Sequence, residues 1–345
     1  MTGHATAAEL RESRGRGCLL GLAIGDALGA PVEFSTRAQI VAQYGPAGIQ
    51  ELAPRAGQPA GVYTDDGQMS VATARGVLDW QAATGWSARA ASAPDLDALA
   101  LAVWARYVEW SRSPGCPLGS PGAQVMAAIK GGVPLTLQHP VNAWGKGCGG
   151  VMRVAPLGLI GLGRWAFEAG ARCATLTHRH PTSDTAAGFL AQLVDHLLAG
   201  APLTDAMARA RGALVGWPGH EETLDAVDAA VRLAASPADV YEAVGQIGHV
   251  GTEEPSEHGK GWVAEETVGI ALYCALRFRG DYAGAVRAAV NISGDSDSTG
   301  AVTGAIVGAA GGAEAIPSAW REQVADSGLL RELGRRLAAV AVCHL

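Results

Sequence analysis

Two short acidic clusters, far apart in the sequence, combine carboxylates with hydroxyl groups, and each opens a stretch of helical character. The first is Thr64-Asp65-Asp66, and the second is Asp295-Ser296-Asp297-Ser298. If the fold brings the four carboxylates together, their repulsion is large and a positive charge must offset it. Oxygen ligands of this kind suit hard divalent cations. A metal-dependent hydrolase is therefore the leading interpretation.

Helix capping is the competing explanation for the first cluster. Thr64 suits the N-cap of a helix, and Asp65 and Asp66 suit its first turn, where the helix dipole favours carboxylates. Capping usually needs one such side chain, so three in a row exceed that requirement.

The second cluster gives the stronger signal. Gly294 allows a tight turn, after which Asp295 and Asp297 would point toward a common centre. An EF-hand calcium loop is excluded, because its twelfth position, counted from Asp295, holds Ile306 instead of glutamate.

Three other segments could carry chemistry. The glycine-rich turn at the start of residues 145–159 could cradle phosphate with its backbone amides, or could be an ordinary connection. His178 and His180 could be ligands or acid–base groups, although such a pair before a proline is more often a turn. Trp262 could stack on a base or pack in the core. Cys148 has no histidine or asparagine partner nearby in the sequence, which argues against a thiol nucleophile.

Glycine gives the clearest indication of architecture. Each of two rows repeats every four residues: Gly17, Gly21, Gly25 and Gly29, and Gly300, Gly304, Gly308 and Gly312. Because glycine inside a helix costs about 1 kcal/mol relative to alanine, such rows indicate close backbone approach. We expect two central helices that pack tightly, with Glu33, Asp295 and Asp297 near one end of the core. Small-residue helices in an Ala/Gly-rich chain are the alternative.

Composition and periodicity favour a large all-α domain. Hydrophobic residues make up 48% and charged residues 17% of the 345 residues, which excludes wholesale disorder. Helical spacing is common, as in the stripe of Met69, Thr73, Val77 and Trp80, whereas strand-like alternation is scarce. We expect one domain over residues 1–345, with 1–13 flexible or partly ordered, and surface loops at 81–97 and 251–260.

The chain shows neither targeting nor polyanion-binding signals. Its net charge is −7, and no basic cluster argues for nucleic acid. The start of the chain lacks an apolar signal core, and the longest apolar run, 301–310, is about half a membrane span. The six cysteines show no CxxC or metal-finger spacing and are expected to be reduced. These features predict a soluble cytoplasmic protein with no membrane partner.

Seven stretches, taken together and in this order, resemble the ADP-ribosylglycohydrolase family. They read GCLLGLAIGDALGAPVEF, YTDDGQMSVATARG, SPGAQVMAAIKGG, GKGCGGVMRVAPLGL, THRHP, GWVAEETVGIALYCAL and ISGDSDSTGAVTGAIVGA, and they span residues 17 to about 312. Each motif alone is modest, whereas the ordered set is highly specific. The resemblance implies an all-α fold, a compact orthogonal multi-helix bundle, around a binuclear centre of two Mg²⁺ ions, with Mn²⁺ possible.

The resemblance also implies roles for individual residues. Asp65 and Glu33 would be catalytic, and His178 would lie near the distal ribose and phosphates. Trp262 would line the adenosine pocket. The metal ligands would be Thr64, Asp65, Asp66, Asp295, Asp297 and Ser298. The loop along the diphosphate would be Gly145, Lys146, Gly147, Cys148 and Gly149.

Three positions depart from the pattern of this family. Gly67 follows the first acidic pair, where Thr or Ser is common, and Ser298 stands where Thr is common. Cys148 stands where some relatives place Asn. Since no metal ligand is lost, an inactive relative is disfavoured, but the specificity for the leaving group stays open.

The expected activity is hydrolysis of the glycosidic bond of mono-ADP-ribosylated proteins or small molecules, with ADP-ribose as product. The negative site would suit a cationic arginine leaving group, so ADP-ribosyl-arginine is the preferred substrate and a serine linkage the alternative. The transition state would resemble an oxocarbenium ion. A non-catalytic ADP-ribose-binding relative and a two-metal nucleotide phosphoesterase remain as alternatives of other classes.

Overall fold

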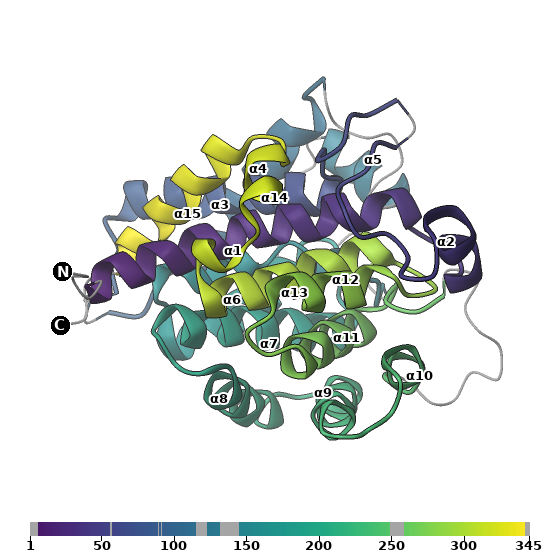
Figure 1. Ribbon diagram of the computed structural model, residues 1–345. Helices are drawn as coiled ribbons and strands as arrows, with labels where there is room; N and C mark the ends of the chain where they lie inside the picture. Colours follow the sequence, from purple (N-terminus) through teal and green to yellow (C-terminus); the bar gives the residue numbers. More distant parts are fainter. Residues whose placement is uncertain are drawn as a thin grey trace, which may run out of the picture.

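The computed structural model describes residues 6–55, 57–88, 90, 92–114, 123–131, 145–248 and 259–341. Within these residues the secondary structure is helical, with isolated β-bridges and no strands, so the predicted all-α class is confirmed (Figure 1). The α-helices are α1 (Ala7–Gly29), α2 (Arg37–Tyr44), α3 (Asp65–Thr84), α4 (Leu96–Ser111), α5 (Ala123–Gly131), α6 (Ala166–Thr175), α7 (Pro181–Leu198), α8 (Leu203–Val215), α9 (Glu221–Ala234), α10 (Val240–Gly245), α11 (Ala264–Arg277), α12 (Tyr282–Val290), α13 (Ser296–Gly311), α14 (Ser318–Gln323) and α15 (Ser327–Val340). Short 3₁₀ helices occupy Ala30–Val32, Cys148–Gly150, Ala155–Ile160, Gly163–Trp165 and Ala313–Ala315.

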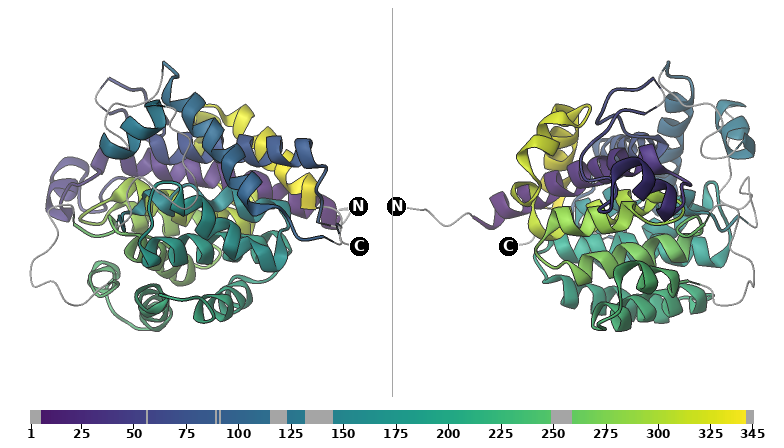
Figure 2. Two further views of the ribbon diagram at one scale, coloured as in Figure 1. Left: turned by 180° about the vertical axis from the view of Figure 1, so that it is seen from behind. Right: turned by 45° about the vertical axis from the view of Figure 1, so that its right-hand side comes forward.

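Helices α1 and α13 form the centre of the fold, and other helices surround this pair. Helix α15 packs on α1, α12 packs on α13, and α3 pairs with α4. Helices α6, α7 and α8 pack in succession, and α11 contacts both α9 and α13. The helices α8, α9 and α10 lie on the side of the molecule away from α3 and α4, as the views in Figures 1 and 2 show.

The two glycine rows meet face to face, which confirms the predicted central pair. A Cβ atom built on Gly17 would lie 2.3 Å from the carbonyl oxygen of Gly308. On Gly21 it would lie 2.2 Å from that of Gly304, and on Gly25 it would lie 2.0 Å from that of Gly300. Because the pairing runs in opposite directions along the two rows, α1 and α13 are antiparallel. The end of α1 therefore lies at the start of α13.

This backbone contact makes a direct prediction for stability. In Gly21→Ala the new methyl group would collide with backbone atoms of α13, so we expect a loss of about 3 kcal/mol in the free energy of unfolding. The matched control is Gly212→Ala in α8, where a Cβ meets no atom within 4 Å. Alanine there should stabilise by about 0.5–1 kcal/mol. Urea denaturation of both variants checks this, and equal effects would disprove the close packing.

Several smaller expectations have clear outcomes. The stripe on α3 from Met69 to Trp80 is buried, as predicted. The loop expected over 81–97 is shorter, because α3 continues to Thr84 and ends where Gly85 adopts a left-handed conformation (φ 64°). The loop expected at 251–260 lies mostly outside the described residues. Helix α1 begins at Ala7 with a capping box formed by Thr6 and Glu9, inside the stretch expected to be flexible or partly ordered.

Two further properties concern the whole described chain. Among the described residues no single helix is long and apolar enough to cross a membrane, although α1 with its 3₁₀ extension (Ala7–Val32) and α2, bent by 91°, pass that test together. Most of α1 is buried inside the fold. The described cysteines, Cys18, Cys148, Cys173 and Cys274, are free and buried, and the other two lie outside the described residues.

Candidate active site

The acidic residues singled out in the sequence converge at one end of the central helix pair. Gly29 closes α1 directly against the first turn of α13, where its Cβ would lie 2.6 Å from Cα of Asp297. Glu33 follows on the 3₁₀ turn Ala30–Val32. Helix α3 begins at Asp65 and contacts both α1 and α13. The fold therefore brings together residues from three distant segments of the chain.

Capping explains part of each cluster and leaves the rest. The hydroxyl oxygen of Thr64 accepts a hydrogen bond from the N–H of Asp66 at 3.3 Å. Asp295 caps α13 in the same way, because its Oδ1 accepts from the N–H of Ser298 at 3.2 Å. The carboxylates of Asp66 and Asp297 are also buried, with 3% of each residue exposed. Capping a helix does not require buried carboxylates, so the burial of Asp66 and Asp297 indicates a functional site.

Asp26 also belongs to this cluster, although the sequence motifs did not identify it as a site residue. It is fully buried on α1, and both of its oxygens accept from the N–H of Thr64, at 2.9 and 3.0 Å. Its Oδ2 also accepts from the N–H of Gly67 at 2.8 Å. Asp26 thereby fixes the turn that presents Asp65 and Asp66. Its signal in the sequence was that Asp26 is the one charged residue between Gly17 and Gly29 in an otherwise apolar stretch of α1.

Gly67, one of the departures from the family pattern, has a steric reason. A Cβ at this position would lie 2.5 Å from Cδ2 of Tyr63 and 3.1 Å from Oδ2 of Asp26. The hydroxyl of Tyr63 is held by Asp326 at 2.8 Å, so the ring is fixed in place. Glycine at position 67 thus accompanies the tyrosine at 63.

The carboxylates raise one another's pKa values. Burial and then repulsion by Asp297 raise the pKa of Asp26, Asp66 and Asp295 well above the ordinary range. Burial also raises the pKa of Asp297 itself. The same two causes, with a contribution from Asp65, raise the pKa of Glu33 to about 8, although Arg55 lies 4.0 Å away. The protein therefore offers little positive charge to compensate this cluster when its carboxylates ionise.

These residues suit divalent cations by chemistry. The donors are carboxylate and hydroxyl oxygens, and Oδ1 of Asp66 is buried without a hydrogen-bond partner. Among the described residues, no group of three or more His, Cys, Asp or Glu side chains could hold a metal ion as it stands. The fit thus rests on the donor chemistry, the mutual pKa shifts and the unpartnered oxygen.

The glycine-rich loop reaches the acidic cluster through Cys148. The N–H of Cys148 donates to the carbonyl of Trp262 at 2.9 Å, and its thiol lies 3.3 Å from Oδ2 of Asp295. The hydroxyl of Ser298 donates to Sγ of Cys148 at 3.4 Å. Burial and the neighbouring Asp295 raise the pKa of this thiol, so it remains protonated. Cys148 thus joins the predicted phosphate loop to two predicted metal ligands.

The segment 259–264 joins the loop to the acidic turn. On one side, the N–H of Ala264 donates to the carbonyl of Lys146 at 2.9 Å. On the other side, the N–H of Lys260 donates to the carbonyl of Ser293 at 2.9 Å, and the N–H of Asp295 donates to the carbonyl of Lys260 at 2.8 Å. Trp262, in the middle of the segment, is 39% exposed. Trp262 is therefore not a core residue, and its ring remains a candidate for stacking on a base.

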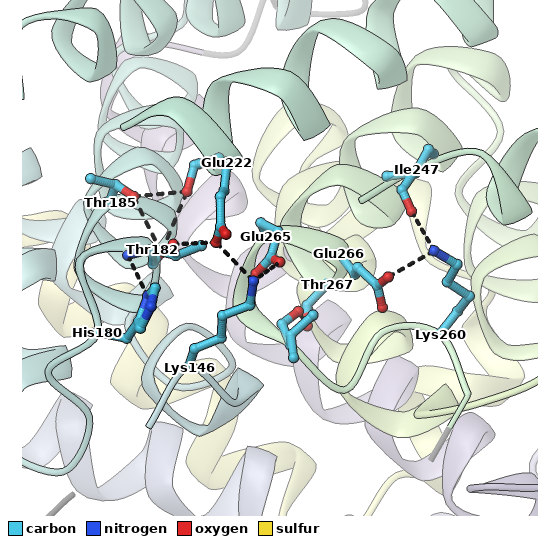
Figure 3. A network of polar contacts seen from close by, with 12 residues as sticks. Lys146, His180, Thr182, Thr185, Glu222, Ile247, Lys260, Glu265, Glu266 and Thr267 are labelled. Atoms are coloured by element: carbon cyan, nitrogen blue, oxygen red, sulfur yellow. Dashed lines mark hydrogen bonds and ion pairs between the residues drawn. The ribbon is translucent and has the colours of Figure 1, made fainter. Parts of the chain in front are cut away.

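Lys146 ties the glycine-rich loop to the start of α11, and Lys260 ties the segment 259–264 to it (Figure 3). Nζ of Lys146 lies 2.6 Å from Glu265 and 2.7 Å from Glu222. Nζ of Lys260 lies 2.7 Å from Glu266. The charge of Lys146 is thus engaged by two carboxylates, so contacts of this loop with a phosphate would come from backbone amides.

The pair of Lys146 and Glu265 makes a stability prediction. The side chain of Glu265 is fully buried, so Lys146→Met would leave a buried carboxylate without its cation. We expect a loss of about 3–5 kcal/mol in the free energy of unfolding. Arg335→Met, which removes an exposed pair with Glu332, should leave stability unchanged and serves as the control. Wild-type stability in Lys146→Met would show that the pair is not needed.

The two histidines have different surroundings. His180 is the N-cap of α7, and its Nδ1 accepts from the N–H of Thr182 at 3.2 Å, as the turn interpretation predicted. His178 is buried, and burial followed by the nearby Arg153 lowers its pKa to about 3. His178 is therefore neutral at physiological pH, and its lowered pKa makes it a weak base there.

Comparisons with known proteins find relatives along nearly the whole chain. The sequence model of the ADP-ribosylglycohydrolase family matches residues 7–344. The ADP-ribosyl-[dinitrogen reductase] glycohydrolase of Rhodospirillum rubrum is 27% identical over 340 residues, which cover 95% of each chain. An uncharacterized protein of Archaeoglobus fulgidus is 29% identical over 337 residues, covering 94% of this chain and 96% of that protein. A solved structure described as an ADP-ribosylglycohydrolase-related protein complex is 26% identical with a TM-score of 0.68, and it covers 96% of this chain and 99% of that one.

The fold and these matches define the class of the protein: it is an all-α member of a family of hydrolases that act on ADP-ribosylated substrates and release ADP-ribose. The chain belongs to the ADP-ribosylglycohydrolase family.

Proposed function

We propose that the protein is a metal-dependent hydrolase of the N-glycosidic bond of ADP-ribosyl-arginine. The observation that carries this proposal is the convergence of five buried or partly buried carboxylates with raised pKa values at one end of α1 and α13. Such a cluster destabilises a metal-free fold, so a function that uses the charge is the simplest reason for it.

The residues present would hold two divalent cations, Mg²⁺ or Mn²⁺. Thr64, Asp65 and Asp66 would supply ligands from α3, and Asp295, Asp297 and Ser298 would supply them from α13. When bound, such cations act as Lewis acids and lower the pKa of bound water. Asp26 would keep the α3 ligands in place through the amides of Thr64 and Gly67.

Glu33 and Asp65 are the proposed catalytic carboxylates. Glu33 is followed by Phe34, a non-glycine residue at φ 55°, whose N–H donates to the carbonyl of Gly294 at 2.7 Å. That strained turn fixes the approach of Glu33 to the cluster. A carboxyl group with a pKa near neutral can take a proton from water or give one to the leaving group.

The preference for arginine follows from charge. The guanidinium group of an arginine-linked substrate is cationic and departs as a neutral guanidine, so a site rich in carboxylates would bind the substrate without opposing this departure. In a serine-linked substrate, negative charge would develop on the departing serine oxygen, and the same carboxylates oppose it.

A panel of ADP-ribosylated peptides tests the proposal. The protein with Mg²⁺ should release ADP-ribose from an arginine-linked peptide at least about tenfold faster than from a serine-linked peptide. Faster release from the serine-linked peptide would disprove the linkage preference. Binding of ADP-ribose without any release would disprove the hydrolase and favour a binding-only relative.

A further inference from the structure

Arg153 is a buried cation without a carboxylate partner among the described residues. Its side chain is fully buried, and its guanidinium donates to the carbonyl of Gly149 at 2.5 Å and to the hydroxyl of Thr177 at 2.5 Å. It also lies 5.0 Å from the ring centroid of Tyr107. Arg153 therefore connects the glycine-rich loop with the turn that carries His178, two features that the sequence analysis treated separately.

The hydrogen bonds around Thr177 determine where His178 carries its proton. A guanidinium can only donate, so Oγ1 of Thr177 accepts from Arg153. Thr177 is fully buried, and Nδ1 of His178, at 2.8 Å, is the acceptor that the described residues offer to its hydroxyl hydrogen. If Nδ1 accepts this hydrogen, the ring proton must reside on Nε2.

The Nε2 edge of the His178 ring faces the glycine-rich loop. A Cβ on Gly147 would lie 3.7 Å from Nε2 of His178, and one on Gly149 would lie 2.8 Å from Cε1 of the ring. Glycine at these two positions keeps the edge of the ring uncovered. The donor is therefore presented beside the backbone of the loop.

We propose that Arg153 and Thr177 are positioning residues that lock His178 as a neutral Nε2–H donor for an oxygen of the substrate diphosphate. This inference rests on the proposed function, because it requires a substrate that contains ADP-ribose. The diphosphate of that substrate would lie along the loop beside His178. A neutral donor stabilises an anionic oxygen and exchanges no proton with it. The site thereby recognises the diphosphate without an acid–base group that could compete with Glu33 and Asp65.

Nitrogen-15 NMR of the ligand-free wild-type protein tests the tautomer first. Two-bond proton–nitrogen spectra identify which ring nitrogen carries the proton, and His178→Gln assigns the signals. We expect a protonated Nε2 and an unprotonated Nδ1 between pH 6 and 8. A proton on Nδ1, or a cationic ring in this range, overturns the inference.

Variants of Thr177 test the consequence for binding. Thr177→Val removes the hydroxyl at nearly constant volume, and we expect ADP-ribose affinity to fall about tenfold, with KM raised and kcat within about twofold. Thr177→Ser restores the hydroxyl and should restore affinity. Thr175→Val is the matched control, because the hydroxyl of Thr175 donates to the carbonyl of Arg172 within its own helix, α6. Unchanged affinity in folded Thr177→Val, or no rescue by serine, overturns the inference.

The outcomes separate this inference from the proposed function. If ADP-ribose binds in a Thr177-dependent manner without turnover, the positioning role of Arg153 and Thr177 is supported and the hydrolase proposal fails. If turnover is metal-dependent but His178 carries its proton on Nδ1, the hydrolase proposal is supported and the positioning role fails.

Discussion

Asp66→Asn should lower the rate of hydrolysis about 100- to 1000-fold and should not destabilise the metal-free protein. The amide has the same shape but supplies no negative charge, so cation binding and its several kcal/mol of transition-state stabilisation are lost. Burial and repulsion by Asp297 raise the pKa of Asp66, which means that its ionised form opposes folding at neutral pH. The variant should therefore unfold at equal or higher urea concentration in the presence of a chelator.

The opposite signs of these two effects distinguish a site residue from a structural one. Asp95→Asn is the control, because Asp95 caps α4 through the N–H of Ala98 and asparagine caps equally well. It should change neither rate nor stability. Asp297→Ala should lose activity in the same way. Full metal-dependent turnover in folded Asp66→Asn or Asp297→Ala would contradict the assigned site.

The metal-free protein should lose stability as the pH rises from 5 to 8. The folded-state pKa values of Asp26, Glu33, Asp66, Asp295 and Asp297 are raised above those of the unfolded chain, to about 8 for Glu33. The folded state therefore binds more protons in this window, and its stability falls as they are released. A net shift equivalent to two pKa units corresponds to about 3 kcal/mol.

Divalent cations should reverse this loss. At 100 times its dissociation constant, a cation that binds only the folded state adds about 2.7 kcal/mol. Urea denaturation at pH 5, 6.5 and 8, with chelator and with Mg²⁺ or Mn²⁺, measures both effects. Asp297→Asn should flatten the pH dependence and abolish the cation effect. Stability that rises with pH in chelator, or that ignores the cations, would refute the carboxylate cluster.

The sequence predicted the centre of the fold because the glycine rows act locally. Four glycines at a spacing of four residues leave one helix face bare, and only another backbone can fill it. The tight packing of two central helices followed from this, as did the placement of Glu33 near Asp297. The resemblance to the family supplied the role of each residue, which spacing alone could not assign.

The contacts that depend on partners distant in the sequence were not predictable. Lys146 was expected beside the diphosphate, and its pairing with Glu222 and Glu265 depends on how α9 and α11 pack. Glu265 stands in the first turn of α11, where an acidic residue is usually explained by the helix dipole. Arg153 was part of a quoted motif, but its contact with Thr177 joins two loops whose approach only the fold determines.

The most direct test of the central claim is a product analysis with the metal controlled. The metal-free protein is incubated with an arginine-linked ADP-ribosyl peptide, either with Mg²⁺ or with excess chelator, and the products are identified by mass. We expect intact ADP-ribose and unmodified arginine with Mg²⁺ and neither product with chelator. Equal release in chelator, or AMP in place of ADP-ribose, would contradict a metal-dependent glycosidic hydrolase.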